Sequence, residues 1–158
     1  MFRGTFLFLP VVTLRRIPNF EQLETKRRYT FKKDEKLKSR KTIEQLFKDG
    51  KSFSNFPFRV LWKPAEGAAA PVQTGFAVSS KHFKRAVDRN RIKRLMREAY
   101  RLQKNELQNL LQQQQKQLAV FIIYVGNELP DYDFIFEKTD HVLTRLIKIT
   151  NENLSSNM

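Results

Sequence analysis

Apolar residues recur at helix and strand spacings along most of the chain after residue 28. Residues 37–50 predict a short amphipathic helix, with Gly50 placed for a left-handed C-cap. Its apolar repeat consists of Leu37, Ile43, Leu46 and Phe47. Aromatic and β-branched residues in 51–63 predict one strand or two short ones, and residues 72–80 predict another. The Pro, Gly and Ala content of 64–71 indicates a loop between them.

The second half of the chain alternates long amphipathic segments with one apolar run. Residues 85–102 predict a basic amphipathic helix, which the polar segment 103–117 either extends or follows as a surface loop. The nearly continuous apolar run 118–126 predicts a central strand buried on both faces. Residues 131–151 predict a last helix, started by Asp131 or Asp133. Its apolar positions are Phe134, Val142, Leu146 and Ile149. This order predicts an α+β fold in which helices pack on a small sheet.

Composition and net charge indicate what kind of molecule the protein binds. A hydrophobic content of 41% over 158 residues is enough for one globular domain with a core. The formal net charge of +14 and the pI near 10.2 indicate a polyanionic partner: RNA, DNA or an anionic membrane surface. Since the chain has no cysteine, it has neither disulfides nor a thiol nucleophile nor Cys-ligated zinc. That fits a reducing compartment, so we expect a cytoplasmic protein.

The termini lack the periodicity of the central part. Residues 1–28 end in a basic cluster at 26–28 and are predicted to be a basic, disordered extension. The apolar run 6–12 is too short to span a membrane, although a signal peptide or interfacial anchor remains an alternative. We therefore expect one folded domain over 29–150 and a C-terminal tail over 151–158.

The basic helix separates its charges from its apolar residues. A ridge with a rise of four residues contains Arg85, Arg89, Lys93, Arg97 and Arg101, with Asn90 and Arg94 beside it. The apolar side contains Ile92, Leu95, Met96, Ala99 and Leu102. Only Asp88 and Glu98 offset the positive charge within the helix, which indicates that phosphates supply the missing anions. Neutralising about six phosphates gives a log-log salt slope of roughly −4 to −5.

Catalytic and metal-binding chemistry is not indicated. His82 and His141 have no partner arrangement for acid–base or metal work, and the acidic residues are scattered. Asp131 and Asp133 are better explained as a helix start. We therefore expect no catalytic residue and no metal site in the protein. No helix stands at turn-helix spacing before the basic helix, which argues against duplex DNA readout. Membrane binding is disfavoured because the core needs the narrow apolar face. A stand-alone protein that binds ribosomal or other structured RNA stays an alternative.

The basic helix also carries a specific motif. Residues 89–97 fit the pattern R-N-x-x-K-R-x-x-R, in which the chain resembles the bacterial ribonuclease P protein component. The resemblance extends over about 29–150, including 36–53 and the strands 75–81 and 119–125. It implies an α-β-β-β-α-β-α sandwich with a left-handed β-α-β crossover, like domain 2 of ribosomal protein S5. It also implies a protein subunit that helps a catalytic RNA remove the 5′ leader of precursor tRNA.

Two RNA surfaces follow from the resemblance. The RNA-binding residues are expected to be Lys81, Lys84, Arg85, Arg89, Asn90, Arg91, Lys93, Arg94, Arg97 and Arg101. The expected cleft for the single-stranded leader contains Ile43, Phe47, Arg59 and Leu61. The family often has phenylalanine where this chain has Ile43, which cannot stack on a base as an aromatic ring does. The expected partners are ribonuclease P RNA and the precursor tRNA leader, with no membrane and no obligate protein partner. The protein alone is expected to bind no cofactor, because the RNA subunit carries the required Mg²⁺.

Overall fold

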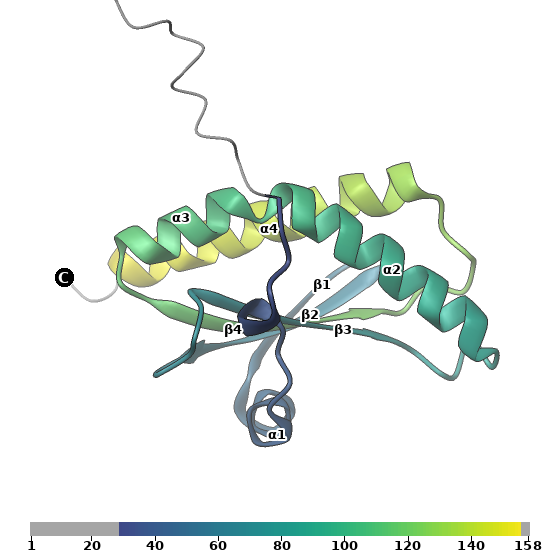
Figure 1. Cartoon of the computed structure of the whole chain (residues 1–158), viewed down its shortest axis with the longest axis horizontal. Helices are drawn as coiled ribbons and strands as arrows, with labels where there is room; N and C mark the ends of the chain where they lie inside the picture. The colour runs from purple at the N-terminus through teal and green to yellow at the C-terminus, as the bar shows by residue number, and fades with distance from the viewer. Residues whose placement is uncertain (1–28, 156–158) are drawn as a thin grey trace, which may run out of the picture.

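A computed structural model describes residues 29–155, with helices on both faces of a four-stranded sheet (Figure 1). The elements in chain order are the 3-10 helix η2 (Lys33–Glu35), α1 (Arg40–Asp49), β1 (Lys51–Asn55), β2 (Phe58–Ala65), β3 (Val72–Val78), α2 (Ala86–Gln103), α3 (Asn105–Gln113), β4 (Gln117–Tyr124) and α4 (Tyr132–Ser155). The strand order is β1-β2-β4-β3. α1 lies on one face of the sheet, and α2, α3 and α4 cover the other.

The predicted α+β class is confirmed. β2 pairs antiparallel with β1 and β4, whereas β3 and β4 are parallel neighbours joined by the crossover through α2 and α3. The left-handed sense of this crossover stays a prediction from the family resemblance. The expected extension at 1–28 lies outside the described residues.

β4 is the central strand that its apolar run predicts. Val120 and Ile122 belong to the core beneath the long helices, whereas Ala119 and Phe121 face α1. Because successive side chains of a strand point to opposite faces, a strand covered on both sides needs apolar residues at nearly every position. The run 118–126 therefore reflects helices on both faces.

The first helix begins at Arg40, after the predicted start at residue 37, and its C-terminus also differs from the prediction. The Ser39 hydroxyl accepts a hydrogen bond from the N–H of Thr42 at 3.3 Å and caps α1. The predicted left-handed C-cap at Gly50 is wrong, because its φ is −72° and its ψ is 145°. Glycine is needed there for space: a Cβ at Gly50 would lie 2.2 Å from the carbonyl oxygen of Leu46. This close approach lets the chain pass directly from α1 into β1.

The polar segment after the basic helix is itself helical. α2 ends at Gln103, and α3 continues after Lys104, with Leu107 and Leu111 buried in the core. The glutamine-rich segment therefore forms a separate amphipathic helix.

The last helix starts at one of the two predicted residues and differs from the prediction further along the chain. The N–H of Ile135 bonds to the carbonyl of Asp131 at 3.2 Å, so the helix starts after Asp131. Ile135 is fully buried, whereas Phe134 is exposed, so the assignment of Phe134 to the apolar face was wrong. α4 also continues to Ser155, which carries helix into the segment expected as a tail.

Residues 29–37, here called the N-terminal strap, run along the free edge of β3. The N–H of Leu37 bonds to the carbonyl of Thr74 at 3.1 Å, and Lys36 forms a bridge with the same residue. Phe31 packs edge-on against Phe76 and Tyr100, with ring centroids 6.0 and 5.7 Å apart. The strap thereby covers one edge of the sheet and joins it to α2.

Candidate nucleic-acid interface

α2 is fixed to the core by its apolar side. Ile92, Met96 and Ala99 are buried, as predicted, together with Tyr100. The Thr74 hydroxyl donates a hydrogen bond of 2.8 Å to the Tyr100 oxygen. Burial raises the pKa of the Tyr100 hydroxyl above its usual range, so the group stays neutral at physiological pH. Tyr100 was not among the predicted core positions, although it stands four residues after Met96 on the same side.

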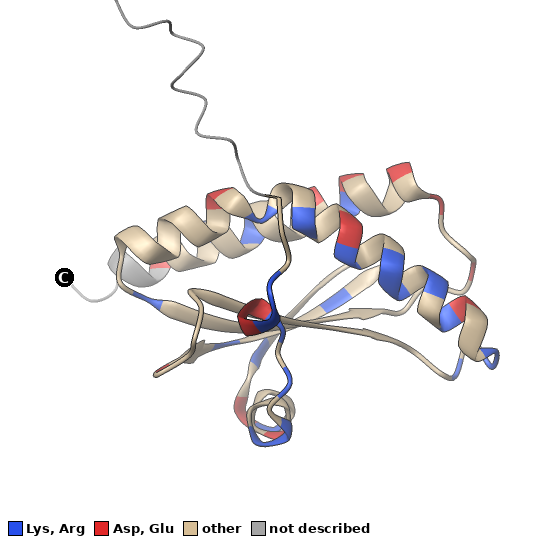
Figure 2. Cartoon of the chain, in the orientation of Figure 1, with Lys and Arg blue, Asp and Glu red and all other residues tan. Residues whose placement is uncertain are grey.

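The opposite side of α2 displays positively charged side chains. Asn90, Arg91, Arg94 and Arg97 are exposed, and Lys93 is half-buried. Figure 2 shows this as a series of blue segments along the α2 ribbon. Within residues 29–155, the four cationic side chains of this group form no ion pair. We call these five residues the cationic face.

Arg89 has a contact that the sequence did not indicate. Its Nη1 donates hydrogen bonds of 2.7 Å to the carbonyls of both Phe83 and Lys84. These bonds hold the loop that precedes α2, which also carries the exposed Lys81. Arg89 therefore fixes the position of neighbouring cationic residues in addition to its predicted contact with RNA.

The two ends of the predicted ridge differ. Arg101 forms two hydrogen bonds with the Glu98 carboxylate, at 2.5 and 2.9 Å, and a third with the carbonyl of Tyr29. The bond from Arg101 holds the pKa of Glu98 below its usual range. Arg85, at the other end, lies 3.9 Å from Asp88 with 78% of its side chain exposed. Arg101 therefore binds the N-terminal strap, whereas the Arg85 side chain remains exposed to solvent.

The predicted leader residues lie on the α1 face of the sheet. Leu61 is buried beside Leu46, and Ile43 packs against the same cluster. Arg59 is exposed on β2, and Phe47 is 56% exposed on α1. Leu61 is therefore turned toward α1, whereas Phe58, Val60 and Trp62 of β2 belong to the core on the other face.

Phe121 is the aromatic residue of this face that sequence reasoning missed. Its ring meets Phe47 edge-on with the centroids 5.5 Å apart. A Cβ at Gly75 would lie 2.4 Å from this ring, so glycine on β3 makes room for it. The even spacing from Ala119 and Ile123 places Phe121 on the α1 face, and this signal was present in the sequence. We call Ile43, Phe47, Arg59, Leu61 and Phe121 the leader surface.

Among residues 29–155, no group of three or more His, Asp and Glu residues is placed to hold a metal ion. No helix in the same range is both long and apolar enough to span a bilayer.

The fold and the cationic face are typical of a small basic protein that binds a nucleic acid. A model of the ribonuclease P family matches residues 31–147. The ribonuclease P protein component of Porphyromonas gingivalis is 39% identical over 115 residues, which cover 72% of this chain and 84% of that protein. The one from Chlorobium phaeobacteroides is 29% identical over 134 residues, covering 77% and 92%. The chain therefore belongs to the ribonuclease P family, as its motif suggested.

Solved structures agree with this assignment. The RNase P protein from Thermotoga maritima is 28% identical, with a TM-score of 0.54 over 70% of this chain and 96% of that one. The Staphylococcus aureus RNase P protein, at 23% identity, shows the fold alone, with a TM-score of 0.57 over 71% and 94%. As a family member, the chain is a protein subunit of ribonuclease P with an RNA-binding role in tRNA processing.

Proposed function

We propose that the cationic face of α2 binds ribonuclease P RNA and that the RNA carries out cleavage of precursor tRNA. The observation that carries this proposal is the set of arginine and lysine side chains at 91–97 without carboxylate partners in the described chain. Guanidinium groups bind phosphate oxygens bidentately, and Asn90 both donates and accepts, which suits a 2′-hydroxyl or a base edge. Lys81, Lys84 and Arg85 extend the same surface along the loop before α2.

The leader surface binds the single-stranded 5′ leader of the substrate in this proposal. Phe47 offers an exposed ring for stacking, and Phe121 supports that ring from the sheet. Arg59 on the neighbouring strand supplies positive charge for the leader backbone. The aromatic contribution thus comes from one helix residue and one strand residue, since Ile43 contributes only apolar contact.

In this proposal the protein positions the two RNA molecules and supplies positive charge between them. Hydrolysis of the phosphodiester uses Mg²⁺ held by the RNA subunit, and the cationic residues reduce repulsion between the two RNA backbones. The protein therefore lowers the Mg²⁺ concentration that cleavage requires.

The salt dependence of binding tests the RNA contact. The dissociation constant for ribonuclease P RNA is measured from 50 to 400 mM salt for the wild type and for Arg94→Ala with Arg97→Ala. Two lost phosphate contacts reduce the log-log slope by roughly 1.4–1.8. The control Lys148→Ala, on α4, leaves the slope unchanged. An unchanged slope in the double variant would show that these two arginines do not contact phosphates.

A further inference from the structure

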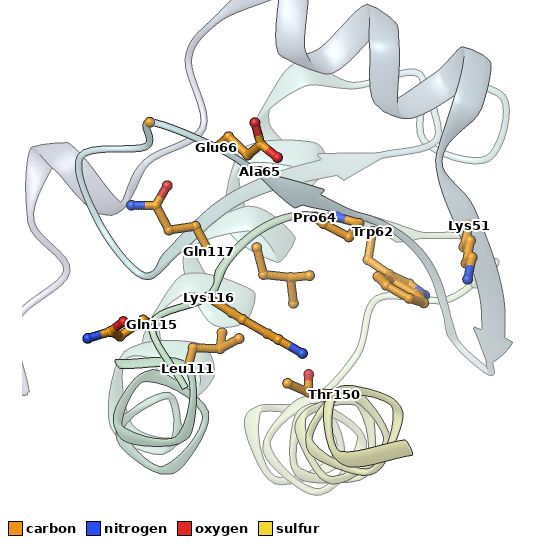
Figure 3. A pocket seen from close by; sticks show the side chains of 12 residues that line it. Lys51, Trp62, Pro64, Ala65, Glu66, Leu111, Gln115, Lys116, Gln117 and Thr150 are labelled. Carbon is orange, nitrogen blue, oxygen red and sulfur yellow. The ribbon is translucent and has the colours of Figure 1, made fainter. Parts of the chain in front are cut away.

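A cavity of about 660 Å³ lies between the sheet and the pair α3 and α4 (Figure 3). It opens where β2 ends and β4 begins, on the sheet face opposite α1. Its lining includes Lys51, Trp62, Leu111, Lys116, Leu118 and Thr150. Its volume falls within the roughly 300–1,000 Å³ of typical small-molecule sites. None of the residues that line the cavity belongs to the cationic face or to the leader surface, so the cavity is separate from both.

Lys116 projects its ammonium group into this cavity. Figure 3 shows the side chain extended toward the space beside Leu111 and Thr150. It is half-buried, and within residues 29–155 its ammonium makes neither a hydrogen bond nor an ion pair. Glu66 also lines the cavity, but Figure 3 shows it at the side away from the Lys116 ammonium. A partly desolvated cation beside apolar walls is stabilised by an anion that enters from outside.

The backbone conformation just before Lys116 orients its side chain toward the cavity. Gln115 has a φ of 53°, in the left-handed region that glycine prefers, and the N–H of Lys116 bonds to the carbonyl of Leu111 at 2.9 Å. A glutamine in this conformation costs free energy. The turn thus fixes where β4 begins and aims Lys116 inward.

The rest of the lining suits a planar aromatic group. Trp62 lies at the cavity wall, and the Lys51 ammonium lies 5.3 Å from its ring centroid. Leu111 and Leu118 supply apolar surface. An indole, two aliphatic side chains and two ammonium groups together match a ligand with a flat ring and a negatively charged group.

We propose that this cavity binds a nucleotide, with its phosphate paired to Lys116 and its base against the wall formed by Trp62, Leu111 and Leu118. Lys51, on the edge strand at the mouth, provides a second positive charge for the phosphate. The nucleotide is either a free mononucleotide or an unpaired residue of a bound RNA, because both present the same chemistry. As a site for a free mononucleotide, the cavity does not depend on the proposed function, because none of its lining residues belongs to the cationic face or the leader surface. As a site for an RNA residue, it rests on that function.

Trp62 is the only tryptophan of the chain and reports on the site directly. Its fluorescence is followed while the full chain is titrated with AMP, adenosine, inorganic phosphate or a short oligoadenylate. We expect a saturable change with AMP and weaker binding of adenosine. Lys116→Ala should weaken AMP binding by roughly tenfold or more, a loss typical of one charge-assisted hydrogen bond. Lys116→Arg should largely retain binding, and the control Lys41→Ala, on the exposed side of α1, should bind as the wild type does.

A site for a free mononucleotide and a site for an RNA residue give different results in this titration. A Lys116-dependent change with AMP supports a site for free mononucleotides, whereas such a change with oligoadenylate alone supports an RNA residue. The proposal is overturned if no probe produces a saturable change, or if Lys116→Ala binds as tightly as Lys41→Ala. Circular dichroism of each variant checks that the fold is retained, and Lys116→Arg tests the charge where the alanine variant is destabilised.

Discussion

Lys104 joins the N-terminal strap to the helical layer, and its replacement by alanine should destabilise the fold strongly. The side chain stands between α2 and α3 and is 1% exposed. Its ammonium forms an ion pair with Glu35 and donates a 2.6 Å hydrogen bond to the carbonyl of Thr30. It also lies 5.7 Å from the ring centroid of Phe31. One buried cation thus holds three residues of the strap.

The size of the loss in unfolding free energy depends on the environment of Glu35 once Lys104 is removed. Glu35 also accepts hydrogen bonds from the N–H of Lys32 at 2.8 Å and from the Gln108 amide at 2.9 Å. Burial alone would raise the pKa of Glu35, but the bonds from Lys104, Gln108 and Lys32 outweigh it and lower this pKa. Without Lys104, a carboxylate remains in a poorly solvated position. Removing one partner of a buried pair typically costs about 3–5 kcal/mol.

Urea denaturation followed by far-ultraviolet circular dichroism measures this loss. Lys104→Ala should lower the free energy of unfolding by about 3 kcal/mol or more. The control Lys148→Ala breaks a pair with Glu152 at 3.8 Å whose side chains are 76% and 63% exposed. It should cost less than about 1 kcal/mol. Combining Glu35→Gln with Lys104→Met should restore part of the loss, because no charge is then left buried. A Lys104→Ala variant as stable as the control would refute this reasoning.

Three further predictions follow from the same structure. Because the pKa of Glu35 is lowered in the folded state, its stabilising effect is present above its unfolded value of about 4.3 and is lost as pH falls through the folded value. Urea titrations from pH 7 to 3 should show this loss, and Glu35→Gln should reduce it. Gln115→Gly should raise the free energy of unfolding by about 0.5–1 kcal/mol by relieving a left-handed backbone, whereas a decrease would contradict that reading. Gly75→Ala should displace Phe121 and weaken binding of precursor tRNA by roughly fivefold, with no effect on mature tRNA; equal effects on both would exclude a leader contact.

Local patterns predicted the elements and the orientation of the basic helix. The spacing of Ile92, Met96 and Ala99 was sufficient to identify the buried side of α2, because helical periodicity depends on neighbouring residues alone. The apolar run of β4 likewise indicated a strand covered on both faces. These features need no knowledge of distant parts of the chain.

Contacts between distant residues could not be predicted in this way. Glu35 and Lys104 are 69 residues apart, and nothing in either local sequence marks them as a buried pair. The need for glycine at Gly75 arises only because the Phe121 ring lies over it on the neighbouring strand. Arg89 looked like its neighbours on the ridge until the path of the preceding loop brought two carbonyls within its reach. Tertiary placement decides each of these roles.

Cleavage of precursor tRNA by ribonuclease P RNA at low Mg²⁺ tests the central claim most directly. The reaction is compared without protein, with the wild type, with Lys93, Arg94 and Arg97 all changed to alanine, and with the control Lys148→Ala. If the cationic face binds the RNA, the wild type and the control restore cleavage, whereas the triple variant requires more Mg²⁺ or more protein. Equal activity of the triple variant and the wild type would contradict the claim that this face of α2 is the RNA-binding surface.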